Sequence, residues 1–236
     1  MFMAEVAINT LIMILCYIYI LTIIFISGKI DKLLNISQKT ARKFLHIMIG
    51  NLPFIIPFFT LAIFPTFVAA PFIIVTFLAT PYSPLKSISK RLKGLSELTE
   101  EGHQWGLVFY AISYTVLAFL FPQKTHVIAA GILPMAYGDA AASIIGEKYG
   151  RHKYKLIAKK SLEGSIAMFL VSLASLGLGL VFFSWFYGFS FLSKIAAVFS
   201  AVTVAAFVEG FSPMGFDNLT VPLFSVLTFL LCGGGA

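Results

Sequence analysis

One acidic residue stands inside a stretch that otherwise has the composition of a membrane-spanning helix. Asp139 follows a long apolar run and precedes Gly146 by about two helical turns. A carboxylate in a spanning helix costs about 2.5–3.5 kcal/mol on insertion scales, so it usually faces a cavity or a partner. A structural hydrogen bond to a neighbouring helix would satisfy it, and so would a ligand or metal site. We predict the second, with Asp139 at a ligand or metal site.

Small residues recur every fourth position after this aspartate, at Ala142, Gly146 and Gly150. Taken alone, this spacing favours close packing of the helix against a neighbour. Beside an acid and a basic run, it also fits a phosphate chain that approaches the backbone, because glycine has no side chain in the way. The sequence has no G-x-x-x-x-G-K-[ST] motif, and the glycines follow no predicted strand. A P-loop and a dinucleotide-binding fold are therefore excluded.

Two lysines and a glutamate open the next apolar run. Lys159, Lys160 and Glu163 are three and four residues apart, so they can share one helical face. A surface ion pair with a snorkelling lysine is the common alternative. Glu163 is followed by uninterrupted apolar residues after Gly164, and a glutamate at this boundary suits phosphates bridged by a divalent ion. Because Mg²⁺ is commonly held by one or two carboxylates plus substrate phosphates, we predict Glu163 as a metal ligand or an orienter of Lys159.

Two further acids flank a helix break near the C-terminal end. Glu209 and Asp217 border a segment that contains Pro213 and Gly215, and Asn218 follows Asp217 directly. Asp and Asn are favoured helix starters, so a capping role for Asp217 is as good an interpretation as metal binding. We retain both Glu209 and Asp217 as candidate metal ligands.

A basic cluster, RKFLH, precedes the second apolar block. Arg42 and His46 are four residues apart on one helical face, and Lys43 follows Arg42. Such clusters most often set topology or attract anionic lipid headgroups. His46 enters the apolar segment, which makes mere solvation a weaker explanation. For the loop 96–106, SELTEEGHQWG, a solvated charge run is as good an interpretation as a site.

The composition is that of a membrane protein. Of the 236 residues, 59% are hydrophobic and 11% are charged, whereas soluble domains are about 25% charged. The excess of 17 Lys and Arg over 10 Asp and Glu does not indicate nucleic-acid binding, because basic residues in a membrane protein mostly record which loops stay in the cytoplasm. Cys16 and Cys232 lie in apolar runs and predict neither a disulfide nor a metal site.

A spanning helix needs about 20 apolar residues. The runs that qualify are 5–27, 104–122, 125–145, 165–186 and 192–208. The block 44–80 is too long for one helix and contains prolines, so we expect two helices with a turn near 57–64. Residues 221–232 form a brief final span or an interfacial helix. The predicted fold is an all-α, polytopic transmembrane bundle of about eight helices.

The predicted bundle is a single domain over residues 1–236. We expect an extra N-terminal helix at 5–28, a nucleotide-binding region at 136–165 and an acidic loop at 209–220. Basic residues fall in three alternate loops, with five at 29–43, four at 86–93 and six at 148–160. By the positive-inside rule these loops are cytoplasmic and the N-terminus lies outside. Counting helices places the loop 209–220 on the cytoplasmic face as well.

In this order, the motifs resemble the polyprenol kinase family, which includes dolichol and phytol kinases, integral membrane enzymes that are typically CTP-dependent. The family pattern of G-D, spaced glycines, K-K/S-x-E-G and D-N-x-x-x-P-L is met at Gly138, Asp139, Gly146, Gly150, 160–164 and 217–223. With RKFLH, the resemblance covers most of the chain after the first helix. The compact length is closer to phytol-kinase-like and prokaryotic members than to the longer dolichol kinases.

The resemblance implies transfer of the γ-phosphoryl of CTP to the hydroxyl of a dolichol, phytol or other isoprenoid alcohol, with Mg²⁺ as cofactor. The active site would face the cytoplasm, and apolar grooves between helices would hold the lipid tail. The catalytic candidates are Asp139, Asp217, Glu163 and His46. The nucleotide-binding candidates are Gly138, Gly146, Gly150, Lys159, Lys160, Ser161, Arg42 and Lys43. The metal-ligand candidates are Asp139, Glu163, Asp217 and Glu209. Asp139 is the first choice of base, Asp217 the second, and His46 follows.

Two rival functions use the same residues. A CTP-dependent cytidylyltransferase that makes a CDP-activated lipid would need similar metals and the same nucleotide. An ion- or proton-coupled transporter would use Asp139 and Glu209 as a relay, but transport sites lie near the membrane midplane, and here the polar groups gather at one side. We expect a multi-pass protein of the plasma membrane in a prokaryote, or of the ER or an organelle in a eukaryote. Membrane lipids are expected partners, and an oligomer is compatible with the sequence.

Overall fold

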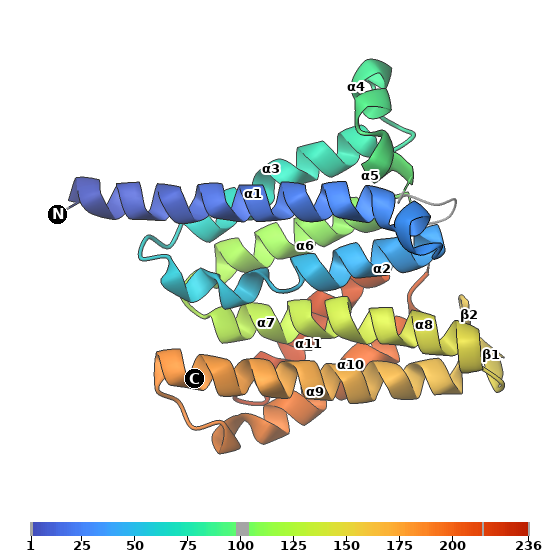
Figure 1. Cartoon of the computed structure of the whole chain (residues 1–236). Helices are drawn as coiled ribbons and strands as arrows, with labels where there is room; N and C mark the ends of the chain where they lie inside the picture. Colours follow the sequence, from blue (N-terminus) through green and yellow to red (C-terminus); the bar gives the residue numbers. More distant parts are fainter. Residues whose placement is uncertain (1, 98–103, 214, 236) are drawn as a thin grey trace. The chain divides into compact units, whose positions relative to one another are not determined.

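The computed structural model describes residues 2–97, 104–213 and 215–235, which divide into two compact units, Met1–Gln123 and Lys124–Ala236. Helices make up nearly all of the regular structure in both units (Figure 1), so the predicted all-α class is confirmed. The prediction that residues 1–236 act as one domain stays a prediction.

The described residues of the first unit are mostly helical. Its elements are α1 Phe2–Leu34, α2 Gln38–Ile49, η1 Leu52–Phe54, η2 Ile56–Phe58, α3 Phe64–Ala79, α4 Lys86–Arg91, α5 Lys93–Glu97 and α6 Gly106–Leu120. Helix α1 ends where Asn35 takes a left-handed φ of 50°, which asparagine adopts more readily than most residues. Helix α2 begins after the N-cap Ser37, whose Oγ accepts the N–H of Thr40 at 3.1 Å.

The break in the second apolar block comes earlier than the sequence predicted. Helix α2 already ends at Ile49, and α3 starts at Phe64. Between them, Pro53 and Pro57 each stand in a short 3₁₀ turn. Proline lacks an N–H and disfavours a helical residue before it, so the two prolines stop the helix in succession. The cluster RKFLH lies inside α2, which begins after Ser37, so Arg42 and His46 do stand on a helix.

The second unit is built around a wholly buried helix. Its elements are α7 Thr125–Leu133, η3 Pro134–Gly138, α8 Asp139–Tyr149, β1 Lys153–Lys155, β2 Lys159–Ser161, α9 Leu162–Tyr187, η4 Leu192–Lys194, α10 Ile195–Phe211 and α11 Asp217–Leu231. All nine residues of α7 are buried. The Oγ of Ser225 on α11 donates to the carbonyl of Ala130 on α7 at 2.6 Å, which joins the last helix to this core.

Helices α7 and α8 form one rod of 25 residues with a π-helical turn in its middle (Figure 1). The turn begins at Pro134, which cannot donate to the helix and whose ring crowds the preceding carbonyls. The N–H of Asp139 bonds back to the carbonyl of Pro134, five residues earlier. The widened turn therefore ends directly at Asp139.

A β-hairpin occupies the segment that the sequence predicted as a basic loop and helix start. Strand β1 pairs antiparallel with β2, with Tyr154 opposite Lys160 and Lys155 opposite Lys159. Helix α9 begins only after Ser161, an extended N-cap whose Oγ accepts the N–H of Gly164 at 3.2 Å. The prediction that Lys159 and Lys160 lie on a helical face is wrong. Ser161 is the N-cap, so the helix starts at Leu162 and both lysines belong to strand β2.

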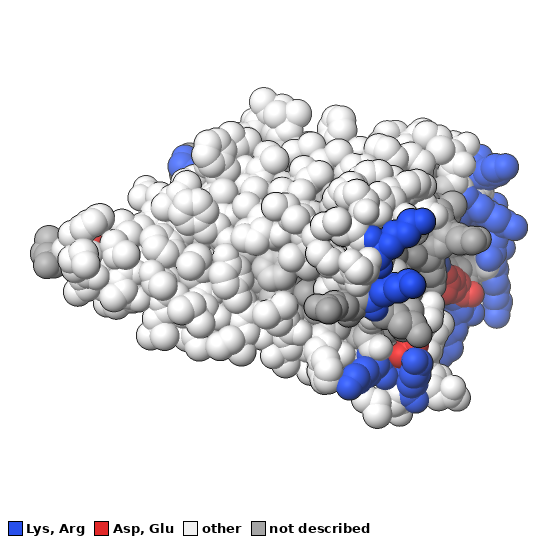
Figure 2. Space-filling model, turned by 90° about the horizontal axis from the view of Figure 1, so that it is seen from above, with Lys and Arg blue, Asp and Glu red and all other residues white. Residues whose placement is uncertain are grey.

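Four helices in the described part of the chain are long and apolar enough to cross a membrane. They are Phe2–Leu34, Thr125–Tyr149, Leu162–Tyr187 and Leu192–Phe211, and the shorter apolar helices are Phe64–Ala79, Gly106–Leu120 and Asp217–Leu231. With α2 these make eight, as the sequence predicted. The surface seen in Figure 2 is mainly white, with Lys and Arg side chains in groups. Which side the N-terminus faces stays a prediction.

Candidate active site

Lys160 lies among acidic side chains in the second unit. Its Nζ donates to Oε1 of Glu209, a residue of α10 that is only 2% exposed. Burial by itself lowers the pKa of Lys160, but the carboxylates of Glu209, Asp139 and Asp217 outweigh it and raise the pKa above its ordinary value. The acids come from α8, α10 and α11, so residues far apart in the chain act on one ammonium group, while their joint role in a site stays a prediction.

The two aspartates occupy the first positions of their helices. Asp139 opens α8 after the π-helical turn and is 5% exposed, and Asp217 opens α11 and is 6% exposed. Oδ1 of Asp217 accepts the N–H of Asn218 at 2.9 Å. Its carboxylate thus serves a helix start, where negative charge is favoured, and also adds to the field around Lys160. The N-cap position itself belongs to Phe216, so the predicted N-cap role of Asp217 is wrong, while its role as a metal ligand stays a prediction.

The hairpin is held in place by Tyr154. Its Oη hydrogen-bonds Oγ of Ser165 on α9 at 2.7 Å. A Cβ added to Gly210 on α10 would lie 3.0 Å from the same Oη, so the absence of a side chain lets the hairpin approach α10. Because Lys160 stands opposite Tyr154 in the hairpin, this contact brings its ammonium group to Glu209, the residue before Gly210.

The predicted nucleotide-binding glycines lie where α8 packs against α9. A Cβ at Gly146 would come within 2.9 Å of Oγ of Ser161, and one at Gly150 within 2.7 Å of the same atom. At Gly138 a Cβ would lie 2.6 Å from Sδ of Met168. Close helix packing, the alternative left open by their spacing, therefore accounts for these glycines. Nucleotide contact at Gly138, Gly146, Gly150 and Ser161 stays a prediction.

Glu163 binds the loop before the hairpin. Its Oε1 accepts the backbone N–H of His152 at 3.2 Å and lies 2.8 Å from the imidazole Nδ1 of the same residue. The N–H of Leu162 also donates to the carbonyl of His152 at 3.0 Å. Glu163 is not among the carboxylates that raise the pKa of Lys160. Its described contacts tie the loop to the start of α9, and its role as a metal ligand stays a prediction.

Arg42, Lys43 and His46 are all buried on α2 of the first unit, with 4%, 5% and 3% exposure. The ring of His46 packs edge-on against Tyr110, with 4.9 Å between centroids. Its carbonyl accepts from Oη of Tyr110 at 3.1 Å. Arginine and lysine are rarely buried without a counter-charge or ligand. Their predicted part in phosphate binding, and that of His46 as a base, stay predictions. The acids and histidine at 98–103 lie outside the described residues.

The acids of the second unit suit a magnesium ion that is completed by substrate oxygens. In residues 2–97, 104–213 and 215–235 no group of three or more His, Cys, Asp or Glu side chains is arranged to hold a metal. Mg²⁺ usually takes one or two carboxylates together with substrate phosphates and waters. Asp139, Glu209 and Asp217 offer this hard oxygen chemistry near the Lys160 ammonium. One or two of these carboxylates with substrate oxygens would suit such an ion, and magnesium as the cofactor stays a prediction.

Fold and site together define a multi-pass, all-α membrane protein with a buried ionic cluster where helices α8, α10 and α11 meet a hairpin. Sequence comparison names its relatives. The chain is 40% identical over 144 residues to a phytol kinase of Synechocystis sp., covering 59% of this chain and 60% of that protein. It is 31% identical over 203 residues to the probable chloroplastic phytol kinase 2 of Oryza sativa subsp. japonica, covering 81% and 65%.

A more distant relative is the CTP-dependent diacylglycerol kinase 1 of Schizosaccharomyces pombe, with 32% identity over 71 residues, or 30% of this chain and 32% of that protein. The chain spans about 60 to 65% of the length of the phytol kinases above. No family model and no solved structure matches it. The chain is homologous to phytol kinases, which confirms the resemblance predicted from the motifs.

Proposed function

We propose that this chain is a CTP-dependent kinase that phosphorylates the hydroxyl of an isoprenoid alcohol, with phytol as the first substrate to test. The observation that carries the proposal is the position of Lys160, a partly buried cation that pairs with Glu209 and feels the charges of Asp139 and Asp217, in a chain whose relatives are named phytol kinases. The choice of CTP is supported by the name of the more distant diacylglycerol kinase.

Phosphoryl transfer needs mainly positioning and charge neutralisation, and this chain offers groups for both. Lys160 exchanges its contact with Glu209 for the phosphate oxygens of the nucleotide, and exposed Lys159 adds a second positive charge. The carboxylate of Glu209, released from Lys160, is then available with Asp139 and Asp217 on the same side. Mg²⁺, when bound to these acids, neutralises the charge of the phosphates.

The reaction is balanced within the site. A bond forms between the alcohol oxygen and the γ-phosphorus, and the bond from this phosphorus to the β–γ bridging oxygen breaks. CDP leaves with that oxygen. Asp139 accepts the alcohol's proton, because it is buried at the start of α8 beside the cation that binds the phosphates. Asp217 is the second choice for this base.

The site faces the cytoplasm in this proposal, on the strength of the positive-inside rule. A lipid alcohol brings its hydroxyl to the interface while its chain stays among apolar helices. A water-soluble nucleotide reaches the same hydroxyl from the basic side. This requirement explains why a buried cation and three acids stand at the ends of membrane helices.

The test is label transfer in purified protein reconstituted in lipid vesicles with Mg²⁺ and phytol. With CTP labelled at the γ-phosphate we expect a labelled lipid, and with CTP labelled at the α-phosphate we expect none. Lipid labelled from the α-position would replace the kinase by a cytidylyltransferase. No label from either nucleotide, with a panel of phytol, geranylgeraniol and longer polyprenols, would refute the proposal.

Lys160→Met and Lys153→Met form a matched pair for this assay. Both lysines belong to the hairpin, but Lys153 is exposed, whereas Lys160 contacts Glu209. We expect Lys160→Met to raise the KM for CTP at least tenfold and Lys153→Met to change it less than twofold. Equal effects would mean that general positive charge on the hairpin, and not the placed ammonium group, binds the nucleotide.

A further inference from the structure

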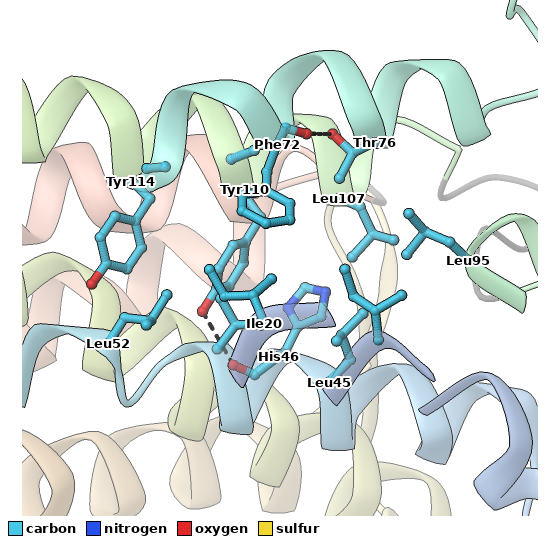
Figure 3. Close-up of a pocket in the computed structure, with 14 residues that line it drawn as sticks. Ile20, Leu45, His46, Leu52, Phe72, Thr76, Leu95, Leu107, Tyr110 and Tyr114 are labelled. Carbon is cyan, nitrogen blue, oxygen red and sulfur yellow. Dashed lines mark hydrogen bonds between the residues drawn. The ribbon is translucent and has the colours of Figure 1, made fainter. Parts of the chain in front are cut away.

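A cavity of about 60 Å³ lies inside the first unit (Figure 3). Helices α1, α2, α3, α5 and α6 contribute to its wall, mostly with branched aliphatic and aromatic side chains. A volume of about 15 Å³ is enough for one water, so the space is large on this scale. Its chemistry is unlike that of the Lys160 cluster, and no step proposed above uses it.

The cavity is elongated along the helices. On α6 it extends from Leu107 to Tyr114, and on α3 from Thr76 back to Ala69. Seven residues of helix correspond to about 10 Å. Figure 3 shows Tyr114 toward one end of the group and Leu95 toward the other. We refer to this space between the helices as the channel.

The polar groups in the wall are mostly turned to the backbone. Thr76 Oγ1 donates to the carbonyl of Phe72 at 2.6 Å, and Tyr110 Oη donates to that of His46 at 3.1 Å (Figure 3). Tyr114 is 3% exposed, and its Oη has no hydrogen-bond partner among the described residues. A polar ligand would find few partners here, whereas a hydrocarbon chain needs none.

Two cations precede the wall residues on α2. Leu45 and His46 line the cavity on α2, and Lys43 and Arg42 precede them within one helical turn. The side chains of Arg42 and Lys43 are buried. Because these cations stand within a turn of His46, the apolar channel fits an amphiphile with its oxygen-bearing head near this part of α2 and its chain directed toward Tyr114.

We propose that this cavity binds part of the apolar chain of the isoprenoid alcohol, with the hydroxyl at the His46 end and the chain toward Tyr114. The proposal rests on the function proposed above for the choice of lipid. A channel of about 10 Å holds only a segment of a phytyl-sized chain, and the rest of the chain lies outside it. Ala111 and Ala69, on facing helices, set the width of the channel.

The test is photo-crosslinking of a phytol analogue that carries a diazirine in its chain, without nucleotide, to full-length protein in vesicles. Mass spectrometry of the labelled peptides identifies the contact site. We expect labelling of α6 around residues 107–114, competed by unmodified phytol. Labels confined to other segments would overturn the proposal.

Two alanines of α6 provide a matched pair. Ala111 lines the cavity, while Ala118 is fully buried outside it. Leucine at either site adds the same volume, but only Ala111→Leu fills the channel. We expect Ala111→Leu to reduce the specific labelling at least fivefold and Ala118→Leu to change it less than twofold. Similar labelling in both variants would overturn the proposal. If Ala111→Leu has a lower melting temperature than Ala118→Leu, Ala69→Leu on α3 replaces it, with the same expectation.

Tyr114→Phe separates a hydrocarbon ligand from a polar one. The change removes the buried hydroxyl and keeps the ring, so chain binding stays within twofold of the native protein. A fivefold loss would show that Tyr114 donates to a polar ligand and would overturn the proposal. Because crosslinking needs no nucleotide, its failure is distinct from failure of the kinase. If the protein phosphorylates phytol but Ala111→Leu does not reduce the labelling, the proposed function stands and the proposal that this cavity is the lipid site fails.

Discussion

Glu209→Gln tests whether Lys160 is held by a buried ion pair. The substitution keeps the shape of the side chain and removes the charge from a residue that is 2% exposed. Removing one partner of a buried pair costs about 3–5 kcal/mol, because the other charge stays behind without compensation. Here Lys160 keeps the carboxylates of Asp139 and Asp217 as neighbours, and its side chain is 22% exposed. We therefore expect a smaller loss, about 2 kcal/mol.

A loss of this size lowers the melting temperature of a protein of this length by about 4–8 °C. The assay is thermal unfolding in detergent, with Lys160→Met, Glu209→Gln and the double variant forming a cycle. If the two residues form an ion pair, the double variant should lose less free energy of unfolding than the two single variants lose together, by about 1–3 kcal/mol. Lys159→Met, on the exposed side of the same strand, is the control. We expect it to change the melting temperature by at most about 2–4 °C, since surface pairs contribute about 0–1 kcal/mol.

The pH dependence of this stability has a definite sign. The neighbouring carboxylates raise the pKa of Lys160 above its ordinary value of 10.5, although burial alone lowers it. A raised pKa means that the charged lysine stabilises the fold fully below pH 10.5 and loses this contribution as the pH rises through the folded-state pKa. The difference in free energy of unfolding between the native protein and Lys160→Met should be constant at neutral pH and shrink above pH 10.5.

Equal melting temperatures for Lys160→Met and Lys159→Met, or additive losses in the cycle, would refute the buried ion pair.

Three further predictions concern activity. Asp139→Asn should lower turnover with γ-labelled CTP by about 10²–10⁴, because the base is lost, and near-native turnover with retained thermal stability would remove Asp139 from the mechanism. Removal of divalent ions with EDTA should abolish turnover, and Mg²⁺ should restore it; activity that survives EDTA would contradict the metal role of the acids. Tyr154→Phe removes the hydrogen bond to Ser165, which contributes about 1 kcal/mol, and should raise the KM for CTP more than it lowers kcat. The opposite pattern would place Tyr154 in the chemical step.

The helices were predictable because each carries its own signal. A run of apolar residues of sufficient length is a local property, and membrane burial of the backbone leaves helices as the main solution. The prolines also predicted a break between α2 and α3, but not the residue at which that break begins. Pro53 acts on the residues before it, so α2 ends at Ile49, well ahead of the predicted turn.

The hairpin was not predicted because its residues are charged. The alternation of Lys153, Tyr154 and Lys155 fits a short strand, but in a basic loop the charges dominate the interpretation. Ser161 also gave a signal, since a serine before an apolar run is a favoured N-cap. Read as a cap, it would have placed Lys159 and Lys160 before the helix.

The sequence predicted that acids and lysines lie on one face of the membrane. It did not predict that Lys160 pairs with Glu209. Lys160 and Glu209 are 49 residues apart, and no local pattern says which acid a lysine will meet. The pairing follows from two close contacts, at Tyr154 with Ser165 and at Gly210 with Tyr154. The same limit applies to the cavity, whose wall combines residues from five helices.

Gly138 shows how packing and ligand binding can be separated by experiment. The structure gives it a packing role, because a Cβ there would meet Sδ of Met168 at 2.6 Å and also Oγ of Ser172. Gly138→Ala should therefore destabilise the fold by about 1–3 kcal/mol through overpacking. Ser172→Gly removes one of the two obstructing side chains, and the flexible end of Met168 can turn away. The double variant should then regain most of the lost melting temperature and also the native KM for CTP. If stability returns while the KM stays raised, Gly138 contacts the nucleotide, and packing alone does not explain it.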